Sequence, residues 1–217
     1  MNMQKLCAEG LGTALLLIGV VGSGIMAQTL TDDIAVALLA NAIATGCTLF
    51  FIITIFGPIS GAHFNPVVTL AFAFKGEHPW PLAAAYIPVQ ILGGVAGVWL
   101  CHVMFDLNII QFSTTPRTGM NQWASEIFAT FGLLLVIFGG LRSRPDTVPT
   151  LVAIYITGAY WFTSSTSFAN PAVTIARAFS DTFAGINPAH VVGFILAQFV
   201  GLALALVVLP RLFAHEE

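Results

Sequence analysis

Two short segments of this sequence share an Asn-Pro pair and nearly the same residues after it. Residues 65–74 read NPVVTLAFAF and residues 170–179 read NPAVTIARAF, with seven of ten positions identical. Proline is favoured in the first turn of a helix, because its missing N–H would have no partner there anyway. About ten helical residues extend about 15 Å, which is half of the hydrocarbon core of a membrane. Each pair therefore predicts a short helix that enters a membrane without crossing it.

The amides that begin these two helices are suited to bind a solute oxygen. If the helices enter from opposite faces, their N-termini meet at the midplane, and each carries about +0.5 charge. The two Asn side chains would then offer N–H donors to a passing water or alcohol. Such a junction repels cations and orients single-file water so that it does not relay protons. The predicted midplane residues are Asn65, Pro66, Val67, Asn170, Pro171 and Ala172.

Two glutamates lie at matching places within long apolar stretches. Glu9 is followed four residues later by Thr13, and Glu126 is followed in the same way by Thr130. A charged side chain within a membrane is costly and marks a functional or structural site. We expect each carboxylate to accept N–H bonds from the irregular chain before a half-helix, as a structural brace. The alternative is a proton relay, which is disfavoured because no further acidic residues continue the path.

The composition identifies the surroundings that these residues need. Of 217 residues, 57% are hydrophobic and 8% are charged, whereas a soluble domain carries about 25% charged residues. Each long apolar segment has about the 20 residues needed to cross a bilayer, where only helices satisfy their own backbone. We therefore predict an all-α membrane protein with six transmembrane helices and two re-entrant half-helices. The six predicted spans are 6–27, 34–56, 82–105, 123–141, 148–166 and 188–210.

The matching features extend into a repeat of the whole chain. Gln90 is followed three residues later by Gly93, and Gln198 is followed in the same way by Gly201. Each half then holds three spans, so the second half must be inserted in the opposite orientation, with the solute path at the interface of the halves. We predict one channel domain over 1–217, made of inverted repeats at approximately 1–110 and 118–213.

Charge and cysteine patterns narrow the location and exclude several classes. Placing five Lys and Arg residues on one side and two on the other puts both termini in the cytoplasm. We expect a multi-pass protein of the inner (plasma) membrane, with its first apolar segment as a span rather than a signal peptide. No basic cluster suggests nucleic acid, and the three cysteines fit neither a disulfide framework nor a metal site. No nucleophile–base pair or metal-ligand set suggests an enzyme, and no cofactor is expected.

The paired signatures resemble those of the aquaporin, or major intrinsic protein, superfamily. The segments SGAHFNPVV and SFANPAV correspond to its paired Asn-Pro-Ala motifs, and Val67 departs from the Ala of the first motif. The resemblance covers nearly the whole chain. It implies six tilted helices, two half-helices and a homotetramer in a lipid bilayer, with one pore per subunit for small neutral solutes.

The departures from the family concern the narrow outer filter. Most members have Arg three residues after the second Asn, where this chain has Val173. Counting without gaps, the resemblance places the other three filter positions at Thr45, Gly158 and Ser167. These residues are small and uncharged, which implies a wide filter with little discrimination between water and small polyols.

Two further residues are candidates for the vestibules of the pore. Arg177 lies two helical turns after Asn170 and could return positive charge to the outer mouth, or it could extend to the lipid headgroups. His63 could line the cytoplasmic vestibule or hydrogen-bond its own loop.

The whole pattern looks most like the bacterial aquaglyceroporins associated with arsenic resistance. The segments GSGIMAQTLTDD and AYWFTSSTSFANPAV and the missing filter Arg carry this resemblance. It implies passage of arsenite as the neutral trihydroxide, together with glycerol-like polyols and water. One alternative is an ordinary water or glycerol channel without a metalloid role. A less favoured alternative is a proton-coupled carrier that uses Glu9 and Glu126.

Overall fold

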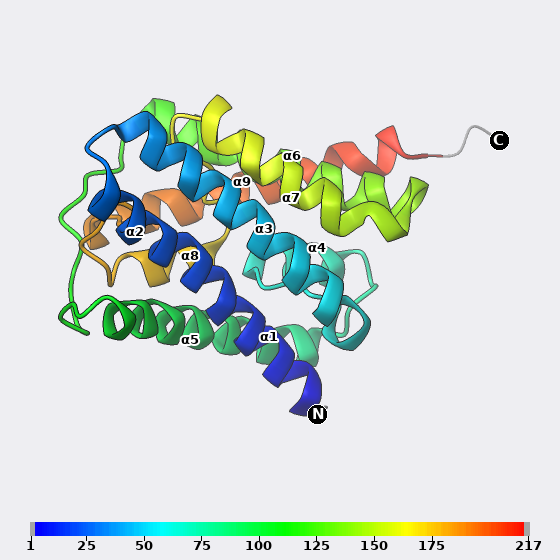
Figure 1. Cartoon of the computed structure of the whole chain (residues 1–217). Helices are drawn as coiled ribbons and strands as arrows, with labels where there is room; N and C mark the ends of the chain where they lie inside the picture. The colour runs from blue at the N-terminus through cyan, green and yellow to red at the C-terminus, as the bar shows by residue number, and fades with distance from the viewer. Residues whose placement is uncertain (1–2, 215–217) are drawn as a thin grey trace.

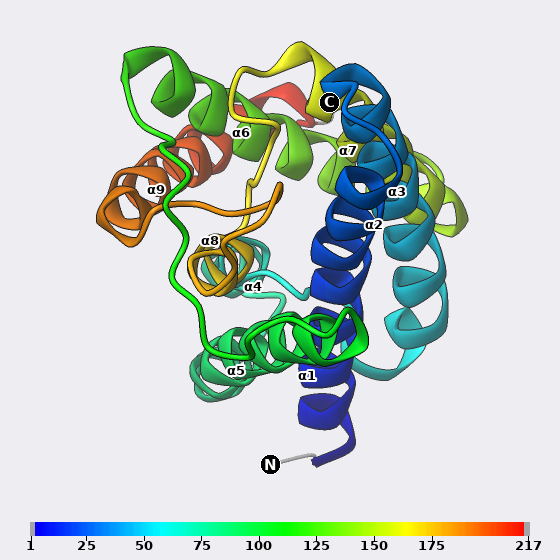
Figure 2. The ribbon, with the colours of Figure 1, turned by 60° about the vertical axis from the view of Figure 1, so that its left-hand side comes forward.

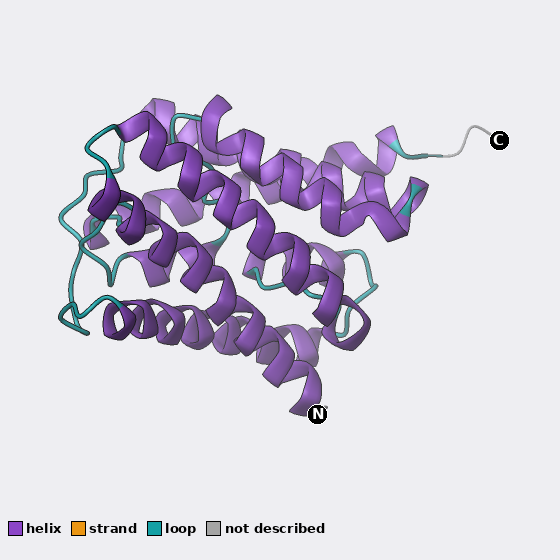
Figure 3. Cartoon of the chain, viewed as in Figure 1, coloured by secondary structure: helices purple, strands orange, loops and turns teal. Residues whose placement is uncertain are grey.

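Six long helical segments surround two short helices in the computed structural model, which describes residues 3–214 (Figure 2). The described residues contain helices, turns and loops but no strand (Figure 3). The all-α prediction is therefore confirmed. The surrounding segments are α1–η1–α2 (Met3–Leu17, Ile18–Gly22, Ser23–Leu30), α3 (Ile34–Ser60), α5 (Trp80–Met104), α6 (Met120–Ser143), α7 (Val148–Phe162) and α9 (Pro188–Leu212). The short helices are α4 (Pro66–Phe74) and α8 (Pro171–Arg177).

Five of the long segments found among the described residues are apolar and long enough to cross a membrane. The remaining one, α7, has 15 residues and extends about 23 Å, which is less than a core of about 30 Å. Its helix ends at Phe162 because Thr163 adopts an extended conformation with φ −116° and ψ 138°. The predicted span 148–166 is therefore four residues too long as a helix.

The long segments alternate in direction, so that the chain begins and ends on one side of the bundle. Helix α1 begins and α9 ends toward the same end, which we call the terminal end, and the loops around residues 106–119 lie at the far end (Figure 1). Helix α3 begins at the far end, where the Asp33 carboxylate caps it by accepting from the Ala35 and Val36 N–H groups at 2.8 and 3.2 Å.

A π-helical turn, η1, interrupts the first span. Its wider turn frees backbone carbonyls from the regular helical pattern, and such turns are rare and often functional. The Asn41 amide of α3 donates to the Val20 carbonyl at 2.7 Å and to the Ser23 hydroxyl at 2.9 Å. A polar side chain of the neighbouring helix thus holds this turn, and no pattern in the sequence had indicated it.

Glycines allow the long helices to cross closely in each half. A Cβ atom at Gly93 would lie 2.2 Å from the Gly10 carbonyl oxygen where α5 crosses α1. In the other half, a Cβ atom at Gly201 would lie 2.6 Å from the Ile127 carbonyl oxygen where α9 crosses α6. Membrane helices depend on such small residues for close packing. Only glycine fits at these two crossings.

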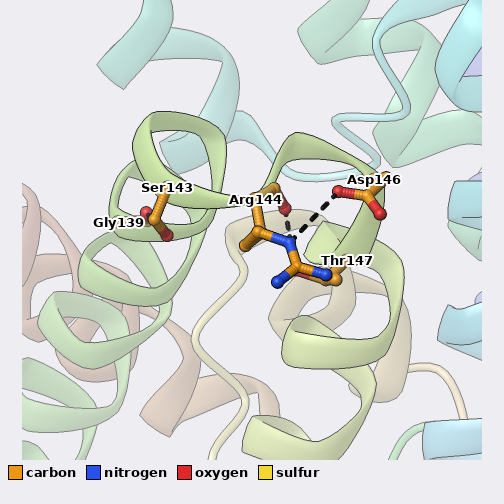
Figure 4. Close-up of polar contacts among 5 residues, drawn as sticks. All are labelled: Gly139, Ser143, Arg144, Asp146 and Thr147. Carbon is orange, nitrogen blue, oxygen red and sulfur yellow. Dashed lines mark hydrogen bonds and ion pairs between the residues drawn. The ribbon is translucent and has the colours of Figure 1, made fainter.

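The turn between α6 and α7 at the terminal end is held by short-range polar contacts (Figure 4). The Ser143 hydroxyl donates to the carbonyl four residues earlier at 2.7 Å, and the Thr147 hydroxyl donates to the Arg144 carbonyl at 2.7 Å. Arg144 Nε lies 3.9 Å from the Asp146 carboxylate, and both side chains are exposed. An exposed pair of this kind contributes little stability, so the turn depends on its hydroxyl bonds and on the backbone bonds of Arg144 and Thr147.

Candidate functional site

The two short helices begin at one junction inside the bundle, and an asparagine caps each of them. The Asn65 side-chain oxygen accepts from the Val67 N–H at 2.9 Å, and the Asn170 side-chain oxygen accepts from the Ala172 N–H at 2.9 Å. Both asparagines are extended, as N-cap residues usually are. Pro66 and Pro171 follow as the first helical residues, where the sequence predicts them.

The same two amides also link the halves of the chain to each other. Asn65 Nδ2 donates to the Ala169 carbonyl at 2.7 Å, and Asn170 Nδ2 donates to the Phe64 carbonyl at 2.8 Å. Each bond therefore runs from one half to the residue just before the other asparagine. An amide nitrogen has two donors, so one N–H of each group has no described partner, although Asn65 is absent from the described lining of the central cavity. Asn170 borders the central cavity.

The irregular segments before the two asparagines repeat the same unusual backbone. Ala62 and Ser167, each three residues before an asparagine, both have φ 51°, and Phe64 and Ala169, each one residue before, both have φ 48°. Left-handed conformations at residues other than glycine cost about 1–3 kcal/mol each and persist only when the surroundings impose them. Both segments therefore need strong local partners.

Glu9 supplies those partners for the first segment. Its carboxylate is fully buried and accepts from the backbone N–H groups of His63 at 3.0 Å and Phe64 at 2.7 Å. It also accepts from the Ser60 hydroxyl at 2.6 Å and from Gln90 Nε2 at 2.8 Å. Four donors thus occupy this carboxylate within the protein.

Glu126 occupies the corresponding place in the second segment. Its fully buried carboxylate accepts from the Phe168 and Ala169 N–H groups, both at 2.9 Å, and from Gln198 Nε2 at 2.6 Å. The same Gln198 nitrogen lies 2.9 Å from the Thr174 hydroxyl. The geometry around both glutamates is what a structural brace requires, and it favours that role over a proton relay.

The sequence did not predict every member of this network. Ser60 was not singled out, although its carbonyl also accepts from the buried Tyr86 hydroxyl at 2.9 Å. The sequence identified Gln90 and Gln198 as matching residues of the two halves. It did not predict that they bind the glutamates. Their equal spacing to the following glycines was the available signal, because a buried polar residue in both halves needs a buried partner.

A cavity of about 130 Å³ runs beside the junction through the middle of the bundle. Apolar side chains form most of its wall, and the polar lining residues are Thr45, His63, Tyr160, Ser167, Asn170 and Arg177. On α7 the lining residues recur every four positions, which marks one face of the helix. These four residues are Val148, Val152, Ile156 and Tyr160.

This face corrects one predicted filter residue. Thr45, Ser167 and Val173 border the cavity as predicted, but Gly158 is absent from its described lining, where Tyr160 stands instead. At 3.6 residues per turn, Gly158 lies roughly 200° around α7 from Ile156. Counting back from the second asparagine without gaps gave the wrong helical face.

Tyr160 changes the expected character of the predicted filter region around Thr45, Ser167 and Val173, which we call the constriction. The Tyr160 hydroxyl lies 3.1 Å from the Thr45 hydroxyl, and both side chains are buried. A large aromatic side chain therefore stands where only small residues were expected.

Arg177 borders the same cavity near its far end. Its side chain is 2% exposed, its Nε donates to the Ala184 carbonyl, and its guanidinium lies 3.5 Å from the centre of the Phe168 ring. The alternative that Arg177 extends toward lipid headgroups is wrong, because the side chain points inward.

His63 lies on the other side of the junction, toward the terminal end. Its ring stacks on Phe72 with centroids 4.8 Å apart, and its Nδ1 lies 3.1 Å from the Thr69 hydroxyl. It also borders both the central cavity and the open mouth beyond it. His63 therefore borders the mouth at the terminal end, and its side chain contacts Thr69 of α4 rather than its own loop. In the adjacent loop, burial and then the nearby Lys5 ammonium lower the pKa of His78.

The cysteines lie away from the solute path. Cys7 and Cys47 are exposed on the surface of the bundle, and Cys101 is buried with its thiol 3.9 Å from the Leu17 carbonyl. Among the described residues that line the cavity there is no cysteine.

Comparison with known proteins agrees with this geometry. The family model described as "Major intrinsic protein" matches residues 1–164. The chain is 53% identical over 203 residues to Aquaglyceroporin AqpS of Rhizobium meliloti (strain 1021), covering 94% of this chain and 87% of that protein. It is 35% identical over 139 residues to Aquaporin NIP1-1 of Zea mays, covering 63% of this chain and 49% of that protein.

A solved structure has the same arrangement of helices. The aquaglyceroporin from Plasmodium falciparum matches with a TM-score of 0.73 over 97% of this chain and 98% of that one. The two sequences are 17% identical, so this match establishes the fold alone. It confirms the prediction of six spans with two half-helices.

Proposed function

This chain belongs to the major intrinsic protein family, and we propose that it is a passive channel for water, glycerol-like polyols and neutral arsenite. Members of this family are multi-pass membrane channels, so the chain is a channel and not an enzyme. The relatives named aquaglyceroporin support the class of small neutral solutes. The finer choice among these solutes is our proposal.

The observation that carries the proposal is the lining of the cavity at Val173. Valine stands at the position where the family resemblance implies an arginine, and the hydroxyl-bearing side chains of Thr45, Tyr160 and Ser167 border the same space. A valine at this position leaves room for a larger neutral solute than an arginine would, although Arg177 borders the same cavity. The apolar lining residues suit the carbon atoms of a polyol, and the hydroxyls suit its oxygen atoms.

Arsenite fits this lining as a neutral trihydroxide that resembles a small polyol. The absence of cysteine from the described lining supports its passage, because a thiol would capture the metalloid instead of releasing it. The resemblance to aquaglyceroporins associated with arsenic resistance points the same way. Arsenite formed on one side of the membrane would then run down its own gradient.

We further propose that the junction of α4 and α8 excludes ions and protons. The spare amide donors of Asn65 and Asn170 would orient water there, while Glu9 and Glu126 hold the irregular segments in place. A proton leak through reconstituted wild-type protein, measured with a pH-sensitive dye inside vesicles, would contradict this assignment.

The assembly and location follow from the family and from the charge pattern. We propose a homotetramer in the inner membrane with both termini in the cytoplasm, built from inverted repeats at approximately 1–110 and 118–213. Light scattering in detergent tests the tetramer, and a monomer mass would refute it. Protease access to a tag at each terminus, in intact and opened cells, tests the orientation.

The experiment that tests the function is uptake into proteoliposomes. Water, glycerol and arsenite are compared at matched protein content, with empty liposomes as the control. We expect all three to enter faster than through lipid alone, and arsenite uptake to fall as rising pH ionises it. If only water moves faster, the channel is a water channel without a polyol or metalloid role.

A further inference from the structure

One buried hydroxyl at the far end of the cavity has no partner within the described part of the protein. Ser167 is 4% exposed and borders the cavity, and its Oγ makes no hydrogen bond to any described residue. Buried polar atoms are almost always paired in native proteins. Several buried polar atoms of the described residues have no partner, but Ser167 Oγ is the one whose residue borders the cavity. A rotation of this side chain would let a solute in the cavity provide the missing partner.

A second hydroxyl group faces the same space. Tyr160 and Thr45 share one hydrogen bond at 3.1 Å, and both border the cavity. Each hydroxyl has one donor and two acceptor positions. One shared bond therefore leaves the pair with one donor and further acceptor positions that a solute hydroxyl could use.

Arg177 completes this group with a fixed cation. It lies four residues after Val173 on α8, so the two residues share a face of the helix. Its Nε donates to the Ala184 carbonyl, but its two terminal nitrogens make no hydrogen bond to any other described residue. Stacking on Phe168 holds the guanidinium in place at 3.5 Å from the ring centre.

The neighbouring Arg117 differs from Arg177 in that all parts of its guanidinium bind the protein itself. Its guanidinium donates to three carbonyls, those of Gly185 at 2.8 Å and of Ser165 and Phe183 at 3.4 Å. It is absent from the described lining of the cavity. Arg117 therefore ties the loops together, whereas Arg177 keeps donors free beside the solute path.

We propose that Ser167, Tyr160 and Arg177 form a binding subsite for a neutral solute with several hydroxyl groups, in which Arg177 replaces the cation missing at Val173. Ser167 and Tyr160 bind two hydroxyls of the solute, and Arg177 donates to a third oxygen while it repels cations. This subsite rests on the proposed function and determines which solutes the channel prefers. It makes Tyr160 and Arg177 specificity-determining residues.

Conservative variants test the subsite without large changes in packing. Ser167→Ala and Tyr160→Phe each remove one hydroxyl, and the ratio of glycerol to water permeability is measured in proteoliposomes by stopped-flow light scattering. Because one hydrogen bond contributes about 0.5–1.5 kcal/mol, we expect each variant to lower this ratio about 2- to 10-fold. Tyr155→Phe is the matched control, because the Tyr155 hydroxyl donates to the Ala129 carbonyl and lies outside the described lining.

Arg177→Gln removes the charge and the two terminal nitrogens, and keeps an N–H donor at about the position of the arginine Nε. We expect a lower ratio of glycerol to water permeability and a measurable potassium leak, which neither hydroxyl variant should show. If this variant does not fold, the two hydroxyl variants still decide the proposal.

The outcomes separate this proposal from the proposed function. If wild-type protein passes glycerol but both hydroxyl variants keep the wild-type ratio, the subsite is wrong and the channel function stands. If wild-type protein passes glycerol no faster than empty liposomes do, the polyol channel itself is wrong, and the subsite falls with it.

Discussion

The junction of the half-helices and the constriction at the far end of the cavity are built on opposite principles. At the junction, each glutamate holds the chain before an asparagine with the same pair of backbone bonds, and each asparagine donates to the other half. At the constriction, the halves differ, and Ser167 has no described partner. Backbone bonds to a buried carboxylate stabilise the fold, whereas an unpartnered hydroxyl beside the cavity is suited to bind a solute. Substitutions in the two regions should therefore affect different properties.

The largest expected effect is the loss of a carboxylate at the junction. Glu126→Leu leaves the N–H groups of Phe168 and Ala169 and one N–H of the Gln198 amide buried without an acceptor. Each unpaired donor costs about 1–3 kcal/mol, so we expect a loss of roughly 3 kcal/mol or more. Thermal unfolding in detergent, followed by size-exclusion chromatography, measures it.

The control for this prediction is a glutamate outside the junction. Glu77→Gln removes a partly exposed carboxylate that pairs with Lys75 at 2.9 Å, and it should leave the unfolding temperature nearly unchanged. An unchanged unfolding temperature for Glu126→Leu would show that the junction does not stabilise the fold.

A smaller effect tests whether the two halves of the junction are equivalent. Asn65→Ala and Asn170→Ala each remove a helix cap and a bond across the halves. We expect each to lose about 2 kcal/mol of stability. Asn187→Ala, which removes only the cap of α9, should lose about 1 kcal/mol. If only one of the two junction variants lost much stability, the two halves of the junction would not be equivalent.

The smallest effect is expected at the exposed turn between α6 and α7. Asp146→Asn removes the contact with Arg144, whose two side chains are 72% and 76% exposed. Because exposed ion pairs contribute little, neither unfolding temperature nor solute permeability should change. A clear change in either would show that this turn contributes more than its geometry indicates.

The difference between the two regions also explains what the sequence could predict. The junction was predictable because its main residues occur at matching places in both halves of the sequence. The pair Glu9 and Glu126 and the pair Asn65 and Asn170 each gave two independent signals for the same role. The six spans and the half-helices were predictable from the length and hydrophobicity of their segments. Residues of the same type at corresponding positions in the two halves indicate that the two halves have corresponding local structures.

The constriction was less predictable because it depends on the phase of a single helix. Whether Gly158 or Tyr160 faces the cavity depends on where α7 ends and on how the irregular chain from Thr163 to Asn170 folds. Counting residues back across an irregular segment determines neither the end of α7 nor the fold of that segment. The recurrence of Val152, Ile156 and Tyr160 every four residues was a better signal, because it reports a helical face directly. Arg177 was placed near the mouth, but its inward direction depends on Ala184 and Phe168, which sequence spacing does not bring together.

The most direct test of the account is glycerol and arsenite uptake by Val173→Arg, measured beside its unfolding temperature. Val173→Met is the matched control, because it adds length without charge. The account predicts that Val173→Arg slows uptake of both solutes about tenfold, which corresponds to a barrier about 1.4 kcal/mol higher, with a smaller effect for Val173→Met and little change in unfolding temperature for either. Uptake by Val173→Arg equal to wild type would contradict the account, because the constriction would then not control which solutes pass.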